Sequence, residues 1–325
     1  MKLNKTSRNN LITYALVLIS FAIIFAMDSF GLTSRQMQSL LVPVCINIIL
    51  AISLNLVVGF LGELSLGHAG FMSVGAYSGC LFSIYMDGII PDMLRFPAAM
   101  LVGGIVAGIF GLIVGIPVLR LKGDYLAIVT LAFGEIVRSI IINLGITGGA
   151  AGLKGTPRDS TFVIAFVVLM ITLIFITNIT NSRDGRAITS IRDNKIAAEA
   201  CGLNVNYYKL MVFVVAAFFA GIAGVIYGHN LSVVTASVFD YNKSIEILVI
   251  VVLGGMGSIR GSIISAVLIT VLPEALRGLQ DYRMLIYAVL LIIVMLVSSA
   301  EQFAGLRAKL DIKNLRKATK KEEVQ

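Results

Sequence analysis

The chain has 325 residues, of which 58% are hydrophobic and 14% are charged, and its net charge is +8. A soluble domain usually carries about a quarter charged residues, so this composition is typical of an integral membrane protein. The basic residues gather outside the apolar runs, near the N-terminus, in residues 183–209 and in residues 307–321. Such placement is typical of cytoplasmic loops and argues against a protein that binds nucleic acid.

Apolar segments of membrane-crossing length recur along the whole chain. A crossing helix needs about 20 mostly apolar residues, because backbone groups in lipid must be satisfied within the segment. We therefore expect a single all-α polytopic membrane domain over residues 1–325. An even number of crossings would place the basic N-terminus and the basic tail (about 301–325) together in the cytoplasm. About ten segments are expected: 11–27, 38–60, 69–86, 97–119, 125–144, 161–179, 210–231, 245–257, 262–276 and 284–299.

Two glycine-rich stretches interrupt these segments, "GFLGELSLGHAGF" (59–71) and "LGGMGSIRGS" (253–262). Paired interruptions in the two halves of a transporter indicate a substrate pathway, since unwound backbone is tolerated only where it lines a cavity or is buried in protein. The same pattern is typical of cytoplasmic turns whose glycines cap helices. Both interpretations stay open. The candidate pathway residues here are Gly62, Glu63, Ser65, Gly67, His68, Gly254, Gly255 and Gly257.

Ionisable residues inside the expected spans are few. Glu135 lies near the middle of one span and Arg138 follows three residues later, so the two can pair on one helix face. A charge in a membrane is costly unless it is paired or faces water, and this pair is either a transport element or a structural ion pair. His229 is expected at the outer membrane interface. Gly224 and Gly228, four residues apart, are expected to let helices pack closely.

The stretch of residues 181–209 is the longest polar connection between spans. Its isoleucines alternate with charged residues, which predicts a short amphipathic helix that Gly202 ends. Loops much longer than two to eight residues that have structure of their own are usually functional. We therefore expect a docking surface for a cytoplasmic partner.

Motifs for catalysis or nucleotide binding do not occur in the chain. No phosphate-binding G-x-x-x-x-G-K-[ST] motif is found, and the two histidines fit no metal-ligand spacing. We expect no metal site and no cofactor in this chain. If transport is driven by ATP, the ATPase must be another polypeptide. Cys45, Cys80 and Cys201 follow no C-x-x-C spacing and are expected to be structural.

Five ordered blocks carry a family resemblance: "GELSLGHAGFMSVGAY", "LKGDYLAIVTLAFGEIVR", "TGGAAGLKG", "DGRAITSIRDNKIAAEACGLNV" and "SIEILVIVVLGGMGSIRGS". From about residue 45 to 299 the chain resembles the LivM-type permease subunits of ATP-binding-cassette importers for branched-chain amino acids. The resemblance implies a prokaryotic plasma-membrane location, a homologous LivH-type permease, two cytoplasmic ATPases, an extracytoplasmic substrate-binding protein and surrounding membrane lipid. It departs from the family at Arg260, where a small residue or proline is frequent.

The resemblance also implies which residues meet the ATPase. The stretch "IRDNKIAAEACG" resembles the family's coupling segment, in which a short helix enters a groove of the ATPase. The candidate coupling residues are Arg192, Asp193, Ala197, Ala198, Glu199, Ala200 and Gly202.

Three classes of function remain. The first is a permease subunit of an ATP-driven importer, for branched-chain amino acids or, as in related permeases, for urea, short amides or other amino acids. The second is a secondary transporter or channel that works alone, which would be expected to carry more membrane-embedded carboxylates than Glu135 and Glu63. The third is a membrane enzyme, for which no nucleophile or acid–base pair stands out.

Overall fold

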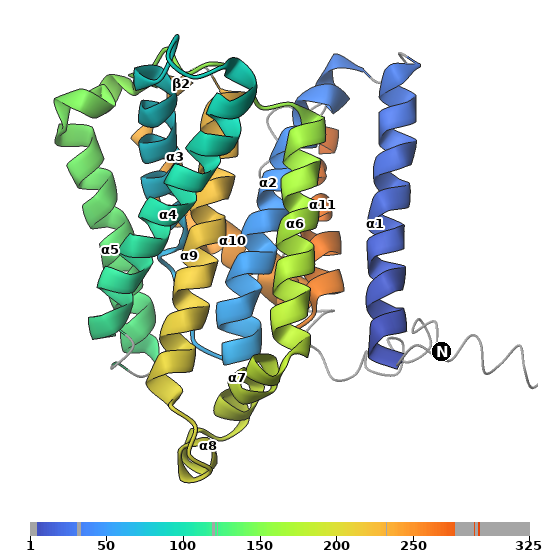
Figure 1. The fold of residues 1–325 in the computed structure, drawn as a ribbon, viewed down its shortest axis with the longest axis vertical. Helices are drawn as coiled ribbons and strands as arrows, with labels where there is room; N and C mark the ends of the chain where they lie inside the picture. The colour runs from blue at the N-terminus through green and yellow to red at the C-terminus, as the bar shows by residue number, and fades with distance from the viewer. Residues whose placement is uncertain are drawn as a thin grey trace, which may run out of the picture. The chain divides into compact units, whose positions relative to one another are not determined.

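The computed structural model describes residues 5–30, 34–118, 121, 123–231 and 233–276, and the single residues 289 and 292. The expected last segment, 284–299, and the basic tail therefore lie outside the described residues, apart from these two. Residues 1–271 form one compact unit, and the end of the last described helix belongs to a second unit, 272–325. The helices of Figure 1 are α1 (Lys5–Ser29), α2 (Arg35–Asn55), α3 (His68–Tyr85), α4 (Asp92–Val118), α5 (Asp124–Asn143), α6 (Phe162–Asn181), α7 (Arg183–Asp193), α8 (Lys195–Ala200), α9 (Val205–Asn230), α10 (Tyr241–Gly254) and α11 (Ile259–Ala275).

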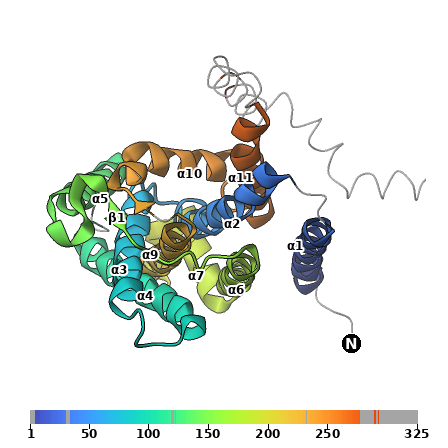
Figure 2. The same ribbon diagram turned by 90° about the horizontal axis from the view of Figure 1, so that it is seen from above.

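Within the described residues, five helical stretches are long and apolar enough to cross a membrane: Met37–Leu61, Met93–Val118, Asp124–Asn143, Phe162–Asn181 and Val205–Asn230. The prediction of a helical membrane protein is confirmed. The helix α10 has 14 residues and is about 21 Å long, shorter than the hydrocarbon core of about 30 Å. In Figure 2 it runs across the view, whereas α9 is seen nearly end-on.

The helix α9 is the centre of the unit and packs against α2, α3 and α4 (Figure 2). Glycines make this packing close. A Cβ atom added to Gly75 would lie 2.2 Å from the Cα of Gly221, and one added to Gly224 would lie 2.0 Å from the carbonyl oxygen of Met72. A Cβ on Gly228 would lie 2.3 Å from the sulfur of Cys80. The predicted glycine pair on α9 therefore packs helices within the bundle.

Two kinds of non-spanning structure lie at opposite ends of this unit (Figure 1). At one end are α7 and α8. At the other, β1 (Leu153–Lys154) and β2 (Val233–Val234) form a short antiparallel pair in which Leu153 lies opposite Val234. The 3₁₀ turns η2 (Gly145–Thr147) and η3 (Gly149–Ala151) precede β1, and η4 (Ala236–Phe239) follows β2.

Residues 181–209 form two helices rather than the single amphipathic helix that was expected. The hydroxyl of Ser182 accepts a hydrogen bond from the Gly185 amide and caps α7, and the Asn194 side chain accepts one from the Ala197 amide and caps α8. Side-chain acceptors of this kind satisfy amide groups that a helix start leaves without partners. Gly202 has φ +83° and follows the end of α8, as predicted for a glycine that ends a helix.

Candidate functional site

The first glycine stretch interrupts the path from α2 to α3. The helix α2 continues into a π-helical segment, η1 (Leu56–Leu61), which ends at Gly62 with φ +79°. Residues 62–67 belong to no helix, and α3 starts at His68. The amide of Leu66 donates to the hydroxyl of Thr130 on α5 at 3.0 Å, and a Cβ on Gly67 would lie 2.7 Å from the Thr130 carbonyl oxygen. This interruption therefore packs directly against α5.

Polar side chains of the first interruption find partners inside the protein. Glu63 forms an ion pair with Lys209 at the start of α9, and the two side chains are 16% and 4% exposed. The ring of His68 is buried, and its Nε2 lies 2.9 Å from the hydroxyl of Ser53. Ser65 is buried as well. In this conformation Glu63 and His68 therefore bond to side chains of neighbouring helices.

The second glycine stretch meets the first. Gly255 and Gly257 have φ +87° and +80° and separate α10 from α11. The amide of Gly257 donates to the side-chain oxygen of Asn55, 202 residues away in the sequence, at 2.8 Å. A Cβ on Gly59 would lie 2.2 Å from the Gly257 nitrogen. We call the two stretches together, Gly59–Gly67 and Gly254–Ser258, the glycine junction.

The backbone near Gly254 is equally crowded. A Cβ there would lie 2.4 Å from the carbonyl carbon of Gly261 on α11. On the α11 side, the Asn55 amide donates to the hydroxyl of Ser262 at 3.1 Å. The junction is thus built from glycines that allow backbone contact, and Asn55 of α2 joins it by bonds to Gly257 and Ser262.

The pair predicted on α5 is formed. The Nε of Arg138 donates to a carboxylate oxygen of Glu135 at 3.0 Å, and each side chain is 32% exposed. The other carboxylate oxygen accepts from the backbone amide of Tyr241, the first residue of α10, at 3.2 Å. Amide groups at a helix start are electropositive and favour such an anion. The pair therefore ties α5 to α10 while remaining partly open at mid-span.

The predicted coupling residues divide into two groups. On α8, Ala197, Glu199 and Ala200 are exposed, whereas Ala198 is buried. Ile196 on the same helix is 79% exposed. Arg192 instead extends from α7 into the glycine junction, where its Nη1 donates to the Gly59 carbonyl oxygen at 2.9 Å.

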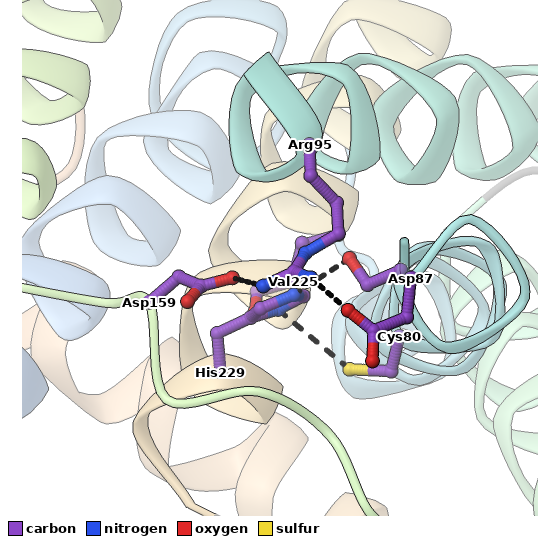
Figure 3. Close-up of polar contacts among 7 residues, drawn as sticks. Cys80, Asp87, Arg95, Asp159, Val225 and His229 are labelled. Atoms are coloured by element: carbon purple, nitrogen blue, oxygen red, sulfur yellow. Dashed lines mark hydrogen bonds and ion pairs between the residues drawn. The ribbon is translucent and has the colours of Figure 1, made fainter. Parts of the chain in front are cut away.

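At the opposite end, His229 lies in the last turn of α9. Its side chain is fully buried, and its Nε2 lies 2.8 Å from the hydroxyl of Ser83. Figure 3 shows Arg95 above it, paired with Asp87 after α3 and with Asp159 before α6, the latter at 3.0 Å. These ion pairs hold the segments after α3 and before α6 over the end of α9, where they cover His229.

Several residues of the site escaped the sequence analysis. Lys209 looked like the last basic residue of a loop, and its partner Glu63 is distant in the chain. A weak signal existed for Asn55 and Ser53, which are polar residues within an apolar run. For Thr130 and Ser262 no signal distinguishes them from the hydroxyl side chains common in membrane helices.

The fold and this site define a multi-pass membrane protein with a polar, glycine-lined junction. Two of its helices, α7 and α8, lie outside the spans. The sequence profile of the family described as "Branched-chain amino acid transport system / permease component" matches residues 36–295. The chain belongs to this family of transport permeases. No solved structure matches the chain.

Relatives in the family differ in the cargo that their names state. The chain is 33% identical to the high-affinity branched-chain amino acid transport system permease protein LivM of Escherichia coli, over 87% of this chain and 73% of that protein. It is 26% identical to the ribose import permease protein RbsC of Haemophilus influenzae, over 88% and 92%. It is 24% identical to LivH, a permease protein of the same branched-chain system in Salmonella typhimurium, over 77% and 88%.

Proposed function

We propose that this chain is the LivM-type membrane subunit of an ATP-binding-cassette importer for branched-chain amino acids. The observation that carries the proposal is the family match across residues 36–295, together with the higher identity to LivM than to the ribose permease. Urea, short amides and other amino acids are the competing cargoes. Uptake by the assembled transporter, measured for leucine, isoleucine and valine against these competitors, decides among them.

The proposed topology has about ten crossings, some interrupted by glycines, in a prokaryotic plasma membrane. The five clear spans supply half of this number, and α1, α3, α11 and the segment 284–299 add four, whereas α10 alone is too short to cross. The start of α1, which follows the basic N-terminus, lies at the same end of the unit as α7 and α8 (Figure 1). Two basic regions on one side favour a cytoplasmic location for that end, since positive residues are retained inside.

Four partners complete the proposed machine: a LivH-type permease, two cytoplasmic ATPases and an extracytoplasmic substrate-binding protein. The similarity between this chain and LivH supports the pairing of two related permeases. ATP hydrolysis belongs to the ATPases, because this sequence has no phosphate-binding loop. The helix α8 is the proposed contact for one ATPase, since its exposed isoleucine and small alanines fit a groove.

The docking proposal is tested by substitutions on α8. Ala200→Trp adds bulk and Glu199→Lys reverses a charge on a surface that contributes nothing to the membrane core, so abundance should persist. Co-purification of the ATPase should fail. The matched control is Ala150→Trp, an exposed alanine at the opposite end of the unit, which should leave ATPase binding intact. Normal ATPase binding by both α8 variants would place the docking surface elsewhere.

The proposed pathway follows the face of α5 that carries Glu135 and Arg138. A charged pair that is one-third exposed at mid-span needs water or a protein partner, because lipid would leave it unsolvated. Exposed isoleucines elsewhere on α5, such as Ile136 and Ile140, suit contact with lipid or with the second permease. The glycine junction contacts the same helix on its buried side, through Leu66 and Gly67 with Thr130.

A further inference from the structure

The side chain of Arg192 bonds to the first half of the glycine junction and lies beside the second. We propose that Arg192 is the positioning residue that transmits movement of α7 and α8 to the junction, so that one guanidinium couples the docking helix to both interrupted helices. This inference rests on the proposed function, because it requires an ATPase that moves α8.

The contacts are specific to this side chain. Its Nη1 donates to the carbonyl oxygen of Gly59 at 2.9 Å, which supplies a donor for one of the last carbonyl groups of η1. A Cβ on Gly62 would lie 2.6 Å from the Cγ of Arg192, so the aliphatic part of the side chain rests on this glycine. A Cβ on Gly257, in the other half of the junction, would lie 3.5 Å from the same Nη1.

Asp193 fixes the orientation of the guanidinium. One of its carboxylate oxygens accepts from both Nε and Nη2 of Arg192, at 3.1 and 3.0 Å. These two bonds leave Nη1 directed at the junction. A planar fork held by a carboxylate in this way gives a defined direction that a lysine ammonium lacks.

The helix α7, which carries Arg192, packs directly against the first half of the junction. The buried face of α7, which includes Ile188 and Ile191, packs on η1, α6 and α9. A single residue, Asn194, separates α7 from α8, and its side chain caps α8. A displacement of α8 should therefore displace α7 as well, because the connection between them is too short to absorb it.

Static anchoring is the competing explanation, and two observations weigh against it. The backbones of Gly59 and Gly257 already lie close together, and Asn55 of α2 bonds to Gly257 and Ser262, so the halves meet without Arg192. The Arg192 side chain is 40% exposed and its carboxylate partner 68% exposed, and exposed ion pairs stabilise a fold by only about 0–1 kcal/mol. The contact of Arg192 with Gly59 therefore adds little to the stability of the fold, and its proposed role is to set the direction in which movement is transmitted.

The test uses the complete transporter, with its partner subunits, in liposomes. We expect Arg192→Gln to lower the number of substrate molecules imported per ATP hydrolysed by about tenfold, within the usual range of coupling between sites. Arg192→Lys should restore part of this ratio, since an ammonium can still donate to Gly59. Arg186→Gln is the matched control, because Arg186 is exposed on α7 and bonds to the Ser182 carbonyl of its own helix. It should leave the ratio unchanged.

The ratio separates coupling from structural damage, which would lower uptake and hydrolysis together. An unchanged ratio in Arg192→Gln, whatever the separate rates, overturns the inference. If the Arg192→Gln protein is not produced in the membrane, Asp193→Asn is tested instead. This variant should lower the ratio of import to hydrolysis by a smaller factor. An unchanged ratio in Asp193→Asn overturns the inference equally. A wild-type complex that shows no ATP-dependent uptake contradicts the proposed function itself, not this assignment alone.

Discussion

At the scale of single residues, the pair formed by Glu63 and Lys209 is the most enclosed charge contact of the junction. Removing one partner leaves the other charge buried and uncompensated, which costs about 3–5 kcal/mol. We expect Glu63→Gln and Lys209→Gln each to lower the thermal unfolding midpoint of the purified protein. The double variant should be more stable than the sum of the two single effects. Additive effects would show that the two side chains do not interact.

Gly67 illustrates how little room the junction leaves. The Cβ of an alanine at this position would lie 2.7 Å from the carbonyl oxygen of Thr130, so backbone must shift, at a typical cost of about 1–3 kcal/mol. Gly67→Ala should therefore lower the midpoint of thermal unfolding. The control is Gly145→Ala, where nothing lies within 4 Å of the added atom. Equal behaviour of the two variants would contradict the close contact with α5.

At the scale of elements, α5 carries the proposed pathway wall. Cysteines that replace Glu135 or Arg138, in a Cys201→Ser background, should react with a membrane-impermeant thiol reagent in the assembled transporter, because thiolates form where water enters. Added substrate should slow the reaction. The control is Ile171→Cys on α6, which is 57% exposed on an apolar helix and should stay unreactive in lipid. Unreactive cysteines at 135 and 138 would contradict the proposed pathway and would indicate that Glu135 and Arg138 form a structural ion pair.

The elements also show what the sequence can predict. Glycines and polar residues within apolar runs reveal where helices break, because few other residues interrupt a membrane span, and the interruptions at Gly62–Gly67 and near Gly255 follow from composition. The meeting of these two interruptions does not, since apolar helices look alike whatever their neighbours. The same limitation hid the partner of Glu63. It also hid the burial of His229, because the connections that cover it are held by Arg95, far away in the sequence.

At the scale of the whole molecule, the unit has the proposed docking helix α8 at one end and a covered, ion-paired cap at the other. Between them lies a junction of two interrupted helices, with α9 as the central support. Such an arrangement suits a permease that is switched from outside the membrane by a partner. It also explains why the chain needs few charged residues within its spans: the energy source is proposed to be ATP bound elsewhere, not an ion that crosses with the cargo.

Reconstitution in liposomes tests the central claim most directly. The purified chain is compared, alone and together with its permease, ATPase and binding-protein partners, for uptake of labelled leucine. The complete assembly should concentrate leucine only when ATP is available to the ATPases, and the chain alone should not concentrate it under any imposed proton or sodium gradient. Concentrative uptake by the chain alone, driven by an ion gradient, would contradict the importer and identify a secondary transporter.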